Sequence, residues 1–148
     1  MVLTNPYPLP QQLSRDLSQV FNYWSNLRRA GNSIPFWDDL NLSALPGLTE
    51  RLFLLDVFEK PERFRFNLVG KVLSERAGES PAGHFADSIK PRAPFGFVLS
   101  QASATVEACA PTFYQHRPQE AGPGFSRILL PMWGDGHVGM LLGAIDLR

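Results

Sequence analysis

The sequence has few of the features that mark secreted, membrane-bound or nucleic-acid-binding proteins. Cys109 is its only cysteine, so no disulfide can form within the chain, which is typical of the reducing cytoplasm. Its 14 Lys and Arg residues balance 14 Asp and Glu residues, so no net field would attract nucleic acid or anionic lipid. The apolar run Val138–Ile145 is far shorter than the ~20 residues of a membrane helix, and the N-terminus lacks a secretory signal. We therefore expect a cytoplasmic protein without nucleic-acid or membrane partners.

Catalytic, metal-binding and nucleotide-binding signatures are missing as well. The histidines His84, His116 and His137 lie far apart and form no HxxxH or HExxH pattern, so the sequence predicts no metal site. No GxxxxGK[ST] loop and no GxSxG turn occurs. Because activity must be argued from a site, and none is visible, we expect a protein that is not an enzyme. The sequence identifies no cofactor.

The length and composition of the chain are those of one globular domain. Its 148 residues, of which 44% are hydrophobic, can form a single core without disulfides or metal. Residues 1–11 carry Pro6, Pro8 and Pro10, and each proline restricts its neighbour to extended geometry. We predict an extended lead-in over 1–11 and a single domain over 12–148.

An amphipathic helix is predicted over residues 12–30. Apolar side chains recur there at helical spacing, and Gly31 with Asn32 supplies a C-terminal stop. The apolar stripe must cover the sheet or pair with a second copy of itself, so it is a candidate interface for a homodimer or a partner. Its residues are Leu13, Leu17, Val20, Trp24 and Leu27.

A β-hairpin is predicted over residues 52–70. Two strand-like runs flank a turn at Pro61, and the second run alternates apolar and polar residues with a period of two. The alternation predicts that Phe66 and Leu68 share one face of a sheet and that Asn67 lies on the other.

A second hairpin is predicted at the end of the chain, with helices between the two. Its strands span 126–133 and 137–147, and residues 111–117 form a further short strand. The intervening helical segments are 71–77, 84–89 and 94–110. Two terminal hairpins around a helical middle predict a small α+β domain.

Short motifs along the chain from Phe21 onward carry a family resemblance. They are Tyr23-Trp24, Leu27-Arg28, the Pro35 turn, Leu52-Phe53-Leu54-Leu55-Asp56-Val57, Arg63-Phe64-Arg65-Phe66, Leu68-Val69-Gly70, Gly83, Leu129-Leu130-Pro131, Asp135-Gly136 and Leu141-Leu142-Gly143. With this order of elements they resemble the PAS family, and at finer grain its small, stand-alone bacterial members. The resemblance implies a PAS-like fold, which is a five-stranded antiparallel sheet with a helical flank over one face, and a sensory role in signal transduction.

The aromatic and apolar residues between sheet and helices predict either a ligand cavity or ordinary core. The candidate cavity wall is Phe66, Leu68, His84, Phe95, Leu99 and Phe113. A neutral His84 could bind haem iron or a ligand, or it could simply cap a turn. Arg127 is a polar strand residue that could orient a ligand, but alternation predicts that it lies on the face opposite Phe66.

Three hypotheses for the function follow. The first is a sensory module that binds a small molecule or a partner protein and passes a packing change to another protein. The second is a ligand-free adaptor that docks proteins through its sheet face or N-terminal helix. The third is an enzyme on a cone-like α+β scaffold, which would need a cavity carboxylate with a raised pKa.

Overall fold

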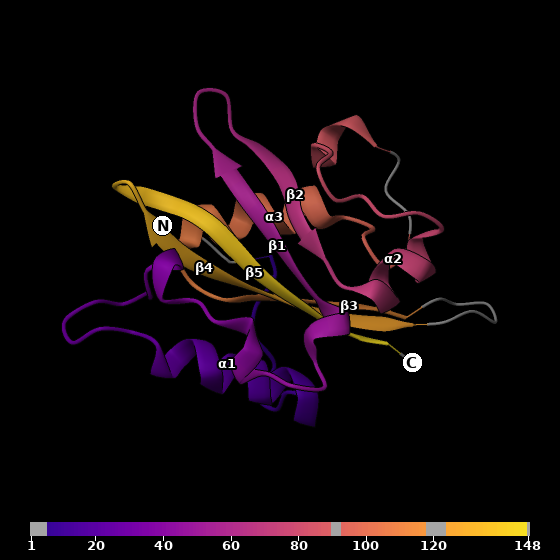
Figure 1. Cartoon of the computed structure of the whole chain (residues 1–148). Coiled ribbons are helices and arrows are strands. Elements are labelled where there is room, and N and C mark those ends of the chain that lie inside the picture. The colour runs from indigo at the N-terminus through magenta and orange to yellow at the C-terminus, as the bar shows by residue number, and fades with distance from the viewer. Residues whose placement is uncertain (1–5, 90–92, 118–123, 148) are drawn as a thin grey trace.

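The fold is an open antiparallel sheet with helices on both faces (Figure 1). The structure is a computed structural model and describes residues 6–89, 93–117 and 124–147. Its strands are β1 (Leu52–Phe58), β2 (Arg63–Val69), β3 (Thr112–His116), β4 (Phe125–Gly134) and β5 (His137–Leu147), in the sheet order β2-β1-β5-β4-β3. The predicted α+β class with five antiparallel strands is confirmed. Residues 1–5 of the expected lead-in lie outside the described residues.

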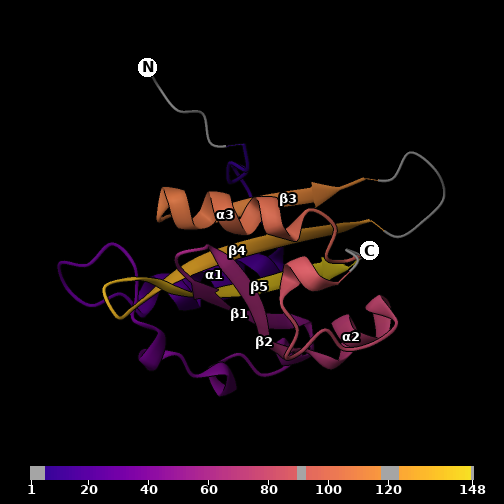
Figure 2. The ribbon, with the colours of Figure 1, turned by 90° about the horizontal axis from the view of Figure 1, so that it is seen from above.

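Three α-helices accompany the sheet: α1 (Arg15–Asn26), α2 (Lys71–Ala77) and α3 (Val98–Ala108). Four short 3-10 turns complete the described elements: η1 (Trp37–Asp39), η2 (Leu42–Ala44), η3 (Thr49–Arg51) and η4 (Ala86–Ser88). Helix α1 packs on β4 and β5 from one face, and α3 packs on β3 and β4 from the other (Figures 1 and 2). No helix in the described part of the chain is long and apolar enough to cross a membrane.

Helix α1 is shorter than the predicted 12–30 at both ends, and Ser14 caps its start. Ser14 has an extended backbone, and its hydroxyl accepts a hydrogen bond from the backbone N–H of Leu17 at 3.4 Å. Leu17, Val20 and Trp24 are buried against the sheet, and the Trp24 indole donates to the Pro131 carbonyl at 2.8 Å. These three side chains are not available to a second copy in this conformation, so a dimer built on them would require α1 to leave the sheet. Leu13 and Leu27, at the ends of the stripe, are only partly buried, and pairing of two copies stays a prediction.

A β-bulge in β2 changes which residues share a face. Leu55 pairs with Phe66 but Leu54 pairs with Leu68, so Asn67 is an extra residue in the ladder. Since Leu54 and Leu55 point to opposite faces, Leu68 does not lie beside Phe66, and the prediction that these two residues share a face is wrong. Leu68 is 38% exposed, whereas Phe66 is fully buried.

Both edges of the sheet are covered by other segments of the chain. Along β2, Phe66 donates its backbone N–H to the His84 carbonyl at 2.9 Å and accepts from Gly83 at 2.7 Å. Along β3, Phe113 donates its backbone N–H to the Tyr7 carbonyl at 3.1 Å. Paired backbone groups at the edges disfavour edge-to-edge association.

The tightest packing in the sheet lies over Gly143. A Cβ at this position would overlap the ring of Phe53, which is itself wedged against Phe66 and Phe95 with ring centroids 6.2 Å and 5.3 Å away. Only glycine therefore lets Phe53 lie flat across β5.

We expect Gly143→Ala to destabilise the fold by about 1–3 kcal/mol, because overpacking forces buried neighbours to move. The measurement is the free energy of unfolding in a urea titration. Gly96→Ala is the matched control, since no atom lies within 4 Å of its added Cβ. Equal stability of the two variants would contradict the packing at Gly143.

Candidate functional site

A groove of about 570 Å³ opens on the face of the sheet that carries α3. Its floor is Phe66, one wall is the η4 segment from Ala86 to Ile89, and the other is the 95–100 segment at the start of α3. A smaller pocket of about 270 Å³ adjoins it, since Phe95 and Ile89 line both, and it also contains His84. The volume of the groove lies within the ~300–1,000 Å³ range of small-molecule sites.

The structure brings together four of the six predicted wall residues. Phe66, Phe95 and Leu99 line the groove, and His84 lines the smaller pocket beside Phe95. The other two lie across the sheet. The bulge in β2 turns Leu68 away from the groove. Phe113 pairs with Ile128, and its neighbour Tyr114 pairs with Arg127 and packs on that side chain. Phe113 therefore lies on the face opposite Arg127.

The alternation of residues predicted the wrong face of the sheet for Arg127. It pairs with Ile145, two residues from Gly143, and so lies on the same face as Phe53 and Phe66. Its side chain is fully buried beneath the start of α3. Nearly all of β4 is buried, because helices cover both of its faces, so no alternation of polar and apolar residues marks the direction of Arg127.

The guanidinium of Arg127 ties the sheet to the lip of the groove. It donates hydrogen bonds to the carbonyls of Pro94 and Gly96, each at 2.9 Å, and to the Gln101 side-chain carbonyl at 2.7 Å. The rings of Tyr114 and Phe125 lie 5.2 Å and 5.6 Å from its central carbon. These contacts fix the backbone on either side of Phe95, whose ring packs on Phe66 in the floor.

A small polar cluster surrounds this arginine. The Gln101 amide donates to the Thr112 hydroxyl at 3.1 Å and to the Arg127 carbonyl at 3.3 Å, and the hydroxyls of Thr105 and Thr112 lie 2.6 Å apart. No carboxylate forms an ion pair with Arg127 within the described ranges. Burial therefore lowers the pKa of Arg127 to about 10, although Tyr114 and Tyr7 act in the opposite direction.

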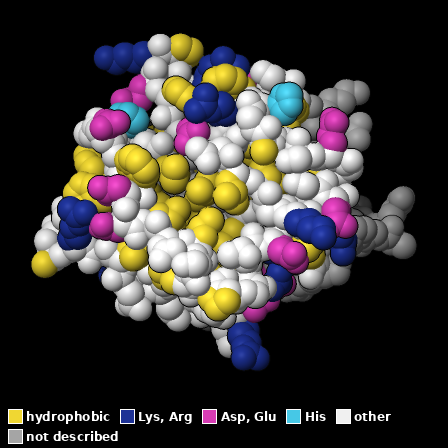
Figure 3. All heavy atoms as spheres, in the orientation of Figure 1, with side chains coloured by type: hydrophobic (Ala, Val, Ile, Leu, Met, Phe, Trp, Pro, Cys, Tyr) yellow, Lys and Arg dark blue, Asp and Glu magenta, His cyan; other side chains and the backbone are white. Residues whose placement is uncertain are grey.

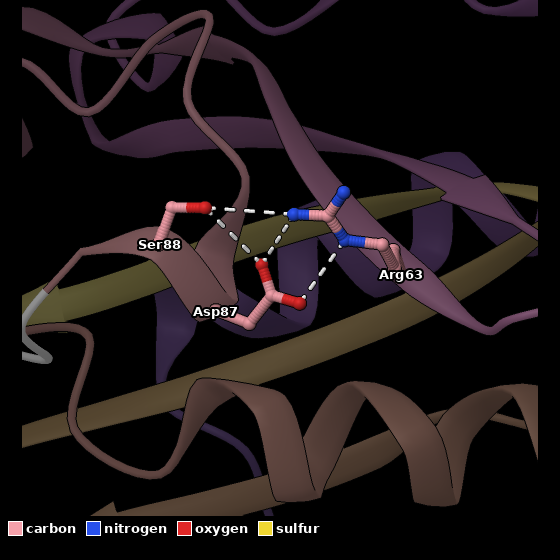
Figure 4. Close-up of polar contacts among 3 residues, drawn as sticks. All are labelled: Arg63, Asp87 and Ser88. Carbon is pink, nitrogen blue, oxygen red and sulfur yellow. Dashed lines mark hydrogen bonds and ion pairs between the residues drawn. The ribbon is translucent and has the colours of Figure 1, made fainter.

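An ion pair holds the other wall of the groove. Arg63 on β2 donates to both carboxylate oxygens of Asp87, at 3.1 Å and 2.8 Å, and approaches the Ser88 hydroxyl at 3.5 Å (Figure 4). The same guanidinium lies 3.8 Å above the ring of Phe85. The hydrogen bonds from Arg63 lower the pKa of Asp87, so this groove residue is a carboxylate at neutral pH.

The opposite face of the sheet carries a second concave surface, of about 480 Å³. The carboxylate of Asp56 accepts hydrogen bonds there from Arg65 at 3.1 Å and from Asn67 at 3.2 Å. Trp37 and Phe58 line it and are exposed. Figure 3 shows a patch of hydrophobic side chains in the middle of this face.

Comparison with known proteins leaves the family open. No protein-family model matches the chain, and no curated protein matches it. Among the residues that the structure describes, no group of three or more His, Cys, Asp or Glu side chains could hold a metal ion.

Arg127→Met should destabilise the fold by about 2–4 kcal/mol, because it removes the donor to the Pro94 and Gly96 carbonyls and to the Gln101 side-chain oxygen. Arg127→Lys should recover only part of this loss, since a lysine cannot bridge both carbonyls. Arg65→Met, which removes a partly exposed ion pair, is the control, with an expected cost of about 0–1 kcal/mol. Unfolding midpoints in denaturant measure all three. Equal costs for Arg127→Met and Arg65→Met would contradict the structural role of Arg127.

Arg63→Gln should raise the pKa of Asp87 toward its ordinary value of 3.8, because the charged hydrogen bonds are lost. Carboxyl NMR titration measures this directly. Asp39, whose pKa is lowered in the same way by Arg29, should not change in this variant and serves as the internal reference. An unchanged pKa of Asp87 would mean that Arg63 does not hold the groove wall in solution.

Proposed function

We propose that the chain is a PAS-type sensory module that binds a small molecule in the groove between η4 and α3. The observation that carries the proposal is the groove itself, which has an aromatic floor, mostly apolar walls and a volume suited to a small ligand. The antiparallel sheet with helices over the groove face agrees with the family resemblance. The single cysteine supports a cytoplasmic location.

The proposed signal is a change in packing of the two walls. One wall is held by Arg63 and Asp87 and the other by Arg127, so a ligand between them would compete with or reinforce both sets of contacts. A ligand shifts such an equilibrium only by its differential affinity for the two states. We propose that a partner protein reads the shift.

A ligand-free adaptor is the second candidate. The exposed side chains of Trp37 and Phe58, which line one concave surface on the opposite face, favour it, because exposed apolar groups that lie together often mark interaction surfaces. An enzyme has weaker support, since the pKa of Asp87 in the groove is lowered, whereas that hypothesis needs a raised one.

Native mass spectrometry of freshly purified protein tests the proposal. We expect a reproducible bound small mass, and we expect Leu99→Glu to abolish it by placing a charge in the groove wall. Leu68→Glu is a matched control, because the same residue type is equally exposed, 38% against 39%, on the opposite face. An apo mass for the wild-type protein, together with capture of a partner that Leu68→Glu disrupts, would favour the adaptor instead.

A further inference from the structure

Arg127 places a buried positive charge beside the groove. A guanidinium has five N–H groups, and three of those in Arg127 donate to Pro94, Gly96 and Gln101. Each of its three nitrogens thus has an acceptor, but no carboxylate pairs with the guanidinium within the described part of the chain. A fully buried cation without a counter-charge is costly, and it leaves a positive potential in surroundings of low dielectric constant.

This potential reaches the groove at its lip. The terminal nitrogen of Arg127 lies 2.9 Å from the carbonyl of Gly96, and Gly96 lines the groove. The only carboxylate among the described groove residues is Asp87, and both of its oxygens are engaged by Arg63. The negative charge on the far wall is therefore already paired with a cation, whereas no carboxylate among the described residues pairs with Arg127.

The start of α3 adds to the same end of the groove. The helix begins after Phe97 without a side-chain cap, and Leu99 and Ser100, in its first turn, line the groove. Their backbone N–H groups have no acceptor in the described structure. Uncapped N–H groups at a helix start favour negative charge, in the same sense as Arg127.

We infer that the ligand of this groove is an apolar molecule that carries a carboxylate. Its apolar body lies on Phe66, Phe95 and Ile89, and its carboxylate lies at the Gly96 end, close to Arg127 and the first turn of α3. The inference rests on the proposed function, because it concerns the same groove. A cationic molecule of the same length is disfavoured by the same potential.

Three eight-carbon probes on the wild-type protein test the inference at pH 7.5: octanoate, 1-octanol and the octyltrimethylammonium ion. They share an apolar chain and differ in charge. Binding is followed by amide chemical shifts in NMR titrations. We expect octanoate to bind on the order of tenfold more tightly than 1-octanol, which is the gain expected from one hydrogen bond to a charged group. Octyltrimethylammonium should bind most weakly.

Single substitutions test whether the preference for octanoate over 1-octanol arises in the groove. Leu99→Glu should weaken octanoate more than 1-octanol, and Leu68→Glu on the opposite face should change neither. Arg127→Lys, which keeps the charge, should retain part of the preference for octanoate that Arg127→Met loses. Because the three-probe comparison uses the wild-type protein, a variant that fails to fold does not remove the test.

Two results would overturn the inference in different ways. Octanoate and 1-octanol binding in the groove with equal affinity, or octyltrimethylammonium binding best, would refute the carboxylate and leave the proposed ligand site standing. Shifts absent from Phe66, Phe95 and Leu99 with every probe would refute both.

Discussion

A buried arginine joins the two layers of this molecule. Arg127 arises from β4, yet its hydrogen bonds end on the carbonyls of Pro94 and Gly96, which lead into α3, and on the side chain of Gln101 within that helix. These contacts fix the backbone on both sides of Phe95, and the ring of Phe95 closes the core against Phe53 and Phe66. The position of α3, the aromatic core under it and one wall of the groove therefore depend on the same guanidinium.

The opposite wall is held by a different kind of contact. The segment around Phe85 pairs with the outer edge of β2 and lies under the guanidinium of Arg63, which also holds Asp87. These groups are partly exposed to solvent, so their attraction is screened by water and salt. The groove thus has one wall anchored by a buried network and one wall held by a surface ion pair. The second wall is therefore the one that can be displaced at lower cost.

Much of the fold could be predicted from the sequence because its signals are local. The turn at Asp135 and Gly136, where both residues have positive φ, specifies a two-residue hairpin, and the helix end at Gly78 follows the usual left-handed cap. The strands were predicted within one or two residues for the same reason. The start of α1 was missed because Ser14 caps the helix from inside the predicted range, and a cap is a single residue that periodicity overlooks.

The sequence by itself determined the elements and the hairpins, since these depend on neighbours along the chain. Tertiary structure alone decided which residues reach the groove. The extra residue Asn67 reverses the direction of Leu68, and the helices on both faces of β4 remove the polarity pattern that would reveal the direction of Arg127. The face of the sheet on which a side chain lies depends on the register between its strand and the partner strand. That register forms between segments that are distant in the chain.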